Sequence, residues 1–218
     1  MGTKIIIGTD FSENSTRALE IGLAWCKTLG CSPIVLHVED KKAEIKEIKD
    51  GLRDRLRDQI EQVVGDERML KDAQIIFGTK EDQLRRMISL SNAKMLVLGA
   101  KGETNLREYF LGGTTERAIR AINIPILVVK DHKAKNPKNI FWGVELGDIG
   151  KYTLEWLKIL GKRFHCSITM GYVIDTKHLK EEKVKEALRA TDLSHLDLLD
   201  MIYEEEKKDL FLDYRDQL

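Results

Sequence analysis

Four glycines at a fixed spacing are the residues of this chain best suited to chemistry. An apolar run ends at Gly99, Gly102 follows three residues later, and the pair Gly112 and Gly113 follows after nine more residues. Glycine allows a positive φ and a close approach of the backbone to a ligand. The N–H groups that open a helix also favour an anion. The spacing therefore predicts a phosphate-binding loop, with four flanking candidates: Leu98, Lys101, Thr114 and Thr115.

Each of these loop residues also has a purely structural alternative. The glycines could serve only to turn the chain, and Lys101 could be solvated. Thr114 and Thr115 could cap the helix that follows them, although capping geometry would aim the same hydroxyls at a bound phosphate.

Short apolar segments alternate with amphipathic ones over residues 1–131, which predicts five strands and four helices. The predicted strands are Lys4–Thr9, Pro33–Val38, Asp72–Phe77, Lys94–Leu98 and Ile124–Lys130. The predicted helices are Ser12–Leu29, Ala43–Val64, Glu81–Leu90 and Thr114–Ala121. Continuously apolar strands that alternate with helices predict an α/β fold, an open parallel sheet with helices on both faces.

A second region, residues 138–218, begins after the polar segment Asp131–Lys138, which we interpret as a linker. A shift of 135 residues aligns Lys4–Asp40 with Asn139–Asp175 without a gap, so the region predicts a second strand–helix–strand copy in tandem. Beyond Asp175 the pattern predicts only helices, at His178–Ala190 and Ser194–Tyr214. The copy would then be truncated, and these helices would pack on their own sheet or bind a partner.

Composition excludes several classes of protein. The formal net charge is zero, which argues against a sequence-independent nucleic-acid binder. No apolar run approaches the ~20 residues of a membrane span, and a strand that begins by Lys4 leaves no room for a signal peptide. The three cysteines lack metal-binding spacing, and their odd number argues against a disulfide framework. We expect them to be reduced, in a cytoplasmic protein.

Residues 3–130 resemble a universal stress protein domain. The matching pieces are Ile5–Ser15, Val35–Val38, the glycine loop, and Glu116–Arg120 before Ile124–Lys130. The resemblance implies a sheet of strand order 3-2-1-4-5, in which strands one and four are adjacent where the order reverses. Ligands of open α/β sheets bind outside the carboxyl ends of the strands at such a point.

The resemblance also implies which residues meet a nucleotide. Thr9, Asp10 and Phe11 would approach it from the first strand, with Asp10 contacting ribose hydroxyls or a phosphate-bound Mg or Mn ion. The backbone of Val38 would touch adenine. The structural alternatives are an Asx turn near Ser12 for Asp10 and a place in the core for Val38. The family usually has Ser or Thr where Gly113 stands, so one hydroxyl contact to phosphate is missing here.

The implied function is an ATP-binding regulatory module of the stress response, working with an unknown protein partner. The sequence shows no general base, nucleophile–base pair or P-loop lysine, so we expect at most slow ATP hydrolysis rather than efficient catalysis. Two other classes stay open: a nucleotide-free scaffold that acts by dimerisation and partner binding, and an adenylating enzyme of the same superfamily. The family commonly pairs its fifth strands between domains, which predicts a homodimer.

Overall fold

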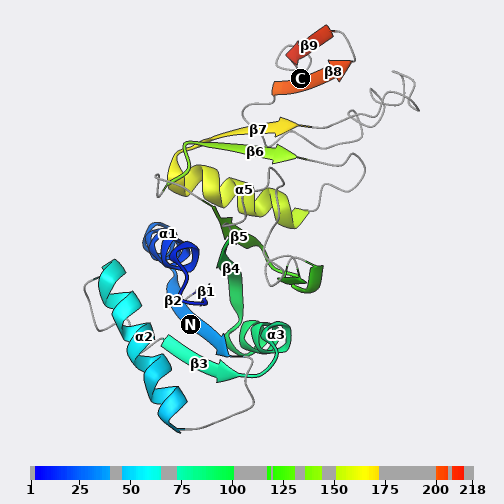
Figure 1. The fold of residues 1–218 in the computed structure, drawn as a ribbon. Helices are drawn as coiled ribbons and strands as arrows, with labels where there is room; N and C mark the ends of the chain where they lie inside the picture. Colours follow the sequence, from blue (N-terminus) through cyan, green and yellow to red (C-terminus); the bar gives the residue numbers. More distant parts are fainter. Residues whose placement is uncertain are drawn as a thin grey trace. The chain divides into compact units, whose positions relative to one another are not determined.

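A computed structural model describes most of the chain. The chain divides into two compact units, Met1–Asn136 and Pro137–Leu218 (Figure 1). The described residues are 3–39, 46–64, 73–100, 117–118, 120–130, 136–143, 151–171, 200–205 and 208–213. The boundary between the units falls inside the segment predicted as a linker.

The first unit is an α/β domain built on one parallel sheet. In chain order its elements are β1 (Lys4–Thr9), α1 (Glu13–Leu29), β2 (Ser32–Glu39), α2 (Lys46–Val64), β3 (Ala73–Phe77), α3 (Lys80–Ser91), β4 (Ala93–Gly99) and β5 (Ile126–Val129). The strand order is β3-β2-β1-β4-β5, which confirms the predicted order. Residues 117–118 and 120–121, within the last predicted helix of this domain, are helical.

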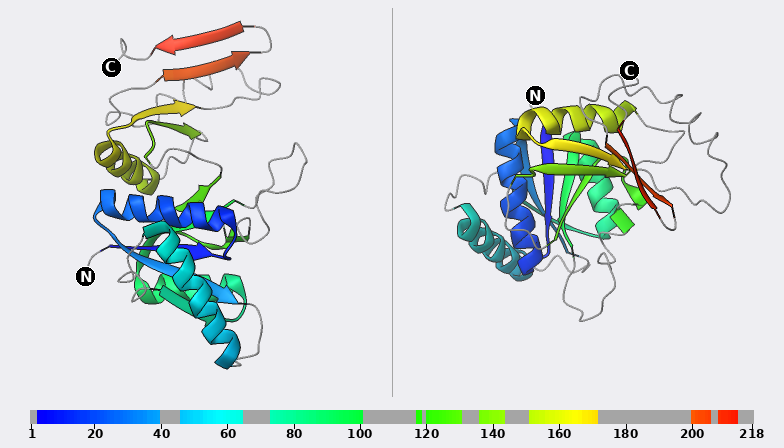
Figure 2. Two further views of the ribbon diagram at one scale, coloured as in Figure 1. Left: turned by 60° about the vertical axis from the view of Figure 1, so that its left-hand side comes forward. Right: turned by 90° about the horizontal axis from the view of Figure 1, so that it is seen from above.

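Helices cover both faces of this sheet, with α1 and α2 on one face and α3 on the other (Figures 1 and 2). The central strand β1 is therefore buried on both sides, and Ile5, Ile6 and Ile7 are each 0% exposed. Helix α1 lies directly on β1: a β-carbon added to Gly22 would come within 2.8 Å of Ile7 Cδ1. This packing explains why the strands read as continuous apolar runs rather than as an alternating pattern.

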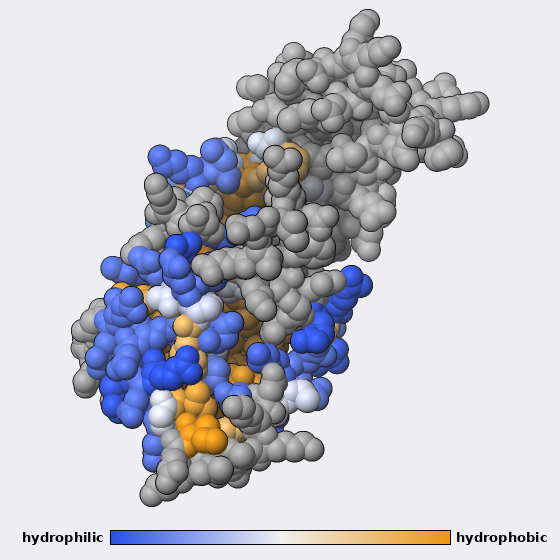
Figure 3. All heavy atoms as spheres, viewed as in Figure 1, coloured by the Kyte–Doolittle hydropathy of each residue, from blue (hydrophilic) through white to orange (hydrophobic). Residues whose placement is uncertain are grey.

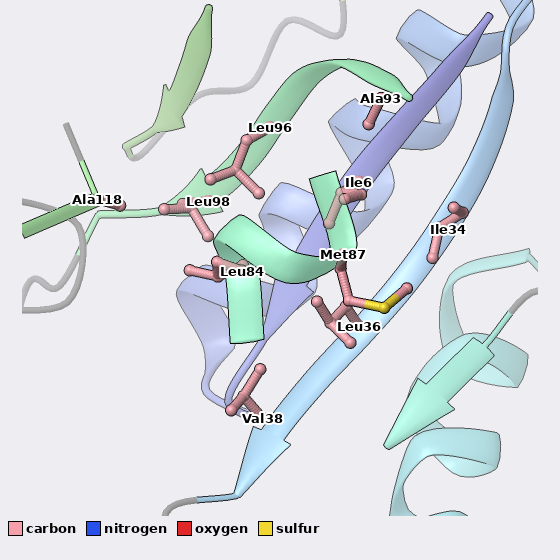
Figure 4. Close-up of a cluster of buried hydrophobic side chains, with 10 residues drawn as sticks. All are labelled: Ile6, Ile34, Leu36, Val38, Leu84, Met87, Ala93, Leu96, Leu98 and Ala118. Atoms are coloured by element: carbon pink, nitrogen blue, oxygen red, sulfur yellow. The ribbon is translucent and has the colours of Figure 1, made fainter. Parts of the chain in front are cut away.

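The opposite face carries the cluster shown in Figure 4, where α3 packs on β1, β2 and β4. Leu84 and Met87 project from α3 towards Ile6 and Leu36. In Figure 3 hydrophilic residues cover much of the described surface, and apolar residues come into view between them. Because helices pack on both faces of the sheet, the core fixes the position of the strand ends.

Helix α1 has well-defined ends, and these set the geometry on both sides of it. Ser12 is the N-cap, and its side chain accepts a hydrogen bond from Ser15 N. The helix stops at Gly30, as predicted, because the residue has φ 70°, a left-handed conformation that glycine adopts without cost. Cys31 N then donates to Cys26 O over 2.8 Å and closes the last turn.

The second unit begins with a strand–helix–strand segment, which the sequence predicts within Asn139–Asp175. It consists of β6 (Asn139–Gly143), α5 (Lys151–Phe164) and β7 (Ser167–Gly171). The two strands are parallel, and Asn139 lies opposite Ser167.

The predicted helix Ser194–Tyr214 is wrong over most of its length. The structure has two antiparallel strands there, β8 (Asp200–Glu205) and β9 (Lys208–Asp213). The physical reason is that two apolar triplets, 201–203 and 210–212, flank six consecutive charged residues. Antiparallel pairing places the triplets opposite each other, Ile202 against Phe211, and places Glu204 opposite Asp209. The other predicted C-terminal helix, His178–Ala190, lies outside the described residues.

Candidate functional site

The carboxyl ends of β1 and β4 lie side by side where the strand order reverses. Ile7 of β1 is opposite Val97 of β4, so Asp10 and Gly99 follow at the same edge of the sheet. This edge is where open α/β sheets bind ligands. The structure thus brings together the described parts of the two predicted site segments.

The turn from β1 into α1 is held by short side-chain to backbone hydrogen bonds. Phe11 N donates to Thr9 Oγ1 over 3.0 Å, and Ser12 N donates to Asp10 Oδ1 over 3.1 Å. The Asp10 bond is the Asx-type interaction that we gave as the structural alternative for this residue. Asp10 therefore shapes the turn, and its carboxylate is exposed at the sheet edge.

Phe11 has an unusual backbone conformation. Its φ is 65°, in the left-handed region that a bulky aromatic residue seldom enters. Such a conformation costs on the order of 1–3 kcal/mol and persists only where surrounding contacts fix it. Besides the bond from Phe11 N to Thr9 Oγ1, the described residues make ring contacts: the Phe11 ring lies 4.3 Å from the His37 ring, and the Arg55 guanidinium lies 4.3 Å over the Phe11 ring.

The environment of Asp10 favours its charged form. Partial burial acts to raise the pKa of its carboxyl, but hydrogen bonds from Ser12 outweigh it. The pKa is lowered from the ordinary value of 3.8. The carboxylate is thus an anion at neutral pH, available to hydroxyl groups or to a cation.

This shift gives a pH-dependent expectation. Because the folded-state pKa of Asp10 lies below 3.8, its contribution to stability is present above pH 3.8 and is lost as the pH falls below that value. We expect the melting temperature of Asp10→Asn to lie below that of the wild type at pH 7 and to converge with it at the acid end. Thermal melts across pH 2.5–7 measure this, and a constant difference between the two proteins would contradict it.

A buried polar network lies directly under the turn. Thr9 Oγ1 donates to Gln59 Oε1 over 2.7 Å and lies 3.0 Å from Ser15 Oγ. Gln59 Nε2 donates to Thr16 Oγ1 over 2.7 Å. Thr9, Ser15 and Gln59 are all buried, so these bonds are made away from water. The network joins the end of β1 to the start of α1 and to α2.

His37 is a buried packing residue near the end of β2. Its Nδ1 lies 2.8 Å from Thr9 O, which requires a proton on Nδ1 because a carbonyl oxygen only accepts. Its Nε2 is buried, has no hydrogen-bond partner among the described residues, and lies 3.7 Å from Glu39 Oε2. The imidazole is therefore held beneath Phe11.

Gly99 has a packing role that its spacing alone did not reveal. A β-carbon there would lie 2.7 Å from Asn14 C and O and 2.9 Å from Ser15 N, all backbone atoms of α1. The first turn of α1 can approach β4 only because residue 99 has no side chain. Close packing against α1 is a role that neither the ligand prediction nor the turn alternative included for this glycine.

The remaining predicted residues divide between core and undescribed chain. Val38 and Leu98 are buried in the cluster of Figure 4, at 6% and 7% exposure. Six predicted loop residues lie outside the described residues: Lys101, Gly102, Gly112, Gly113, Thr114 and Thr115. Sequence reasoning missed Gln59 and Arg55, which no motif marks because they come from a charged helix far along the chain.

Neither a metal cluster nor a membrane-spanning helix is found in the described part of the chain. No group of three or more His, Cys, Asp or Glu side chains there could hold a metal ion. None of the described helices has the length and apolar character needed to cross a bilayer.

Comparison with known proteins identifies the family. Residues 1–130 match the universal stress protein family, and this is more than half of the 218-residue chain. The chain belongs to the universal stress protein family. The resemblance predicted from residues 3–130 is thereby confirmed for the first unit.

Two named relatives each cover about three fifths of the chain. Universal stress protein MJ0577 of Methanocaldococcus jannaschii is 29% identical over 160 residues, covering 60% of this chain and 96% of that protein. Stress response protein NhaX of Bacillus subtilis is 26% identical over 161 residues, covering 58% of this chain and 97% of that protein.

Some solved structures are similar over most of the chain. The crystal structure of a universal stress protein from Archaeoglobus fulgidus matches with a TM-score of 0.65 and 15% identity, covering 93% of this chain and 79% of that one. At this identity the likeness concerns the fold alone.

Proposed function

We propose that the first unit is an ATP-binding regulatory module, with the nucleotide held between Asp10 and the loop from Gly99 to Thr115. The observation that carries this is the ionised, exposed carboxylate of Asp10 at the sheet edge where the strand order reverses between β1 and β4. The glycine spacing of the loop that follows β4, and membership of a family with ATP-binding members, support the same ligand. A Mg or Mn ion would be held through the nucleotide phosphates and Asp10.

We propose binding with at most slow hydrolysis. His37 is the imidazole nearest to Asp10 in sequence, and it is buried under Phe11 with Nδ1 committed to Thr9 O. It is therefore not placed to activate a water molecule above the sheet edge. Bound ATP would act by favouring one conformation or assembly of the protein over another.

The proposal is tested by an Asp10→Ala variant. We expect ATP affinity to fall by about tenfold, as for the loss of a charged hydrogen-bonding partner, while the free energy of unfolding falls by only ~1 kcal/mol, as for a lost cap. Isothermal titration and thermal melts measure the two effects. A collapsed melt with unchanged affinity would show that Asp10 is only structural.

A nucleotide-free scaffold is the second candidate. Gly113 removes a hydroxyl from the expected phosphate contacts, and Gly99 is already explained by packing against α1. A scaffold of this kind would act through dimerisation and an unidentified protein partner. We also propose a cytoplasmic location, which is consistent with three cysteines that form no disulfide.

We further propose that the second unit is a truncated tandem copy of the domain. Adding 135 to the β1–β2 pair Lys4 and Ser32 gives Asn139 and Ser167, which pair in β6 and β7. The bond from Ser32 N to Thr3 O recurs as the bond from Ser167 N to Lys138 O. The left-handed residue that ends α1, Gly30, recurs at position 165 as His165, with φ 51°. These matches support an origin by duplication.

A homodimer is the last part of the proposal. Strand β5 is the last strand of its sheet and pairs with β4 along one side only. A two-stranded parallel sheet such as β6-β7 is small for independent stability. Association of two chains would cover the edge of β5 and would stabilise the small β6-β7 sheet. Light scattering at micromolar concentration should give twice the 25.0 kDa chain mass, and a mass of 25.0 kDa would rule the dimer out.

A further inference from the structure

Helix α2 holds the β1–α1 turn at two points. Arg55 and Gln59 are four residues apart in α2 and so lie on one side of the helix. Arg55 contacts the Phe11 ring, and Gln59 bonds to the Thr9 hydroxyl. Asp10 lies between Thr9 and Phe11 in the chain, so the residues on both sides of it are fixed by α2.

The hydrogen bond from Thr9 to Gln59 has a defined direction. Thr9 Oγ1 accepts from Phe11 N and has a single proton of its own, which it gives to Gln59 Oε1. Ser15 Oγ donates to Ser12 O over 2.8 Å, so its proton is also committed. Gln59 is thus the acceptor that orients the Thr9 hydroxyl towards the Phe11 amide.

Gln59 is also anchored on its other side. Its amide nitrogen donates to Thr16 Oγ1 at 2.7 Å and lies 3.4 Å from Ser15 Oγ. The side chain is 6% exposed, so water does not replace these bonds if they are lost. A change at this one position therefore reaches the end of β1 and the first turn of α1 together.

The contact of Arg55 stabilises the strained residue itself. The left-handed Phe11 needs contacts that outweigh its backbone strain, and a guanidinium 4.3 Å over the ring supplies a cation–π interaction. Arg55 is exposed, whereas Gln59 is buried. A substitution of Arg55 therefore tests the hold of α2 on the β1–α1 turn with less effect on folding.

We propose that Gln59 and Arg55 are positioning residues for the nucleotide: through Thr9 and Phe11 they set the place of the Asp10 carboxylate without touching the ligand. This inference rests on the proposed ATP site. On this proposal, the contacts that α2 makes with the β1–α1 turn affect the affinity of the site for ATP. By linkage, ATP would stabilise α2 as strongly as the α2 contacts favour ATP.

The test uses Gln59→Met, which keeps the length of the side chain and removes its hydrogen bonds, together with Arg55→Met. Arg57→Met is the control, because Arg57 lies on the same helix and pairs with Asp54 rather than with the turn. We expect ATP affinity to fall about tenfold for Gln59→Met and about threefold for Arg55→Met, and to be unchanged for Arg57→Met.

The second readout does not depend on ATP. The amide resonances of Asp10, Phe11 and Ser12 should shift in Gln59→Met and Arg55→Met and stay in place in Arg57→Met. Unchanged resonances in both variants would overturn the positioning role. Shifted resonances with no ATP binding by the wild type would instead overturn the proposed function and leave the positioning role standing.

Discussion

Replacing Gly99 by alanine is expected to lower the free energy of unfolding by about 2–3 kcal/mol, the range of an overpacked core. The added β-carbon would lie 2.7 Å from the Asn14 carbonyl group and 2.9 Å from Ser15 N. Both are backbone atoms of a helix whose next turns are packed on β1, so they cannot move aside cheaply. Denaturant unfolding followed by circular dichroism measures the loss.

Gly51→Ala is the matched control for this prediction. Gly51 lies in the interior of α2, and a β-carbon there would meet nothing within 4 Å. Alanine should therefore raise the free energy of unfolding by about 0.5–1 kcal/mol, through helix propensity. If Gly99→Ala proved as stable as the wild type, the close approach of α1 to β4 would be wrong.

The second large effect concerns Gly102, the next glycine of the predicted loop. We expect Gly102→Val to abolish ATP binding, because a β-branched residue disfavours positive φ and blocks the approach of the backbone to phosphate. Isothermal titration of the variant with ATP should give no measurable heat of binding. Gly51→Ala should bind ATP as the wild type does, and equal binding by Gly102→Val would place the site elsewhere.

Much of the first unit could be predicted because its signals are local. The apolar runs of β1 and β4 and the glycine that ends α1 each act within a few residues of their own position. Only the family resemblance implied the order of the strands, because pairing between β1 and β4 joins segments that are about ninety residues apart in the chain.

The parts that sequence reasoning missed depend on contacts across the fold. Gln59 reads as one more polar residue of a charged helix, and its role appears only when α2 lies beside Thr9 and Ser15. Gly99 was assigned to a ligand, but the backbone of Asn14 already accounts for it. In β8 and β9, residues at helical spacing also fit two facing strands, and the pairing of Ile202 with Phe211 decides between them.

The central claim about this protein is that the wild-type chain binds ATP. Native mass spectrometry of the wild-type chain, incubated with excess ATP and Mg, gives the mass of the bound species at each charge state. We predict one ATP for each 25.0 kDa chain, in agreement with a single complete domain. A spectrum that holds only the bare chain at saturating ATP would contradict the proposed function.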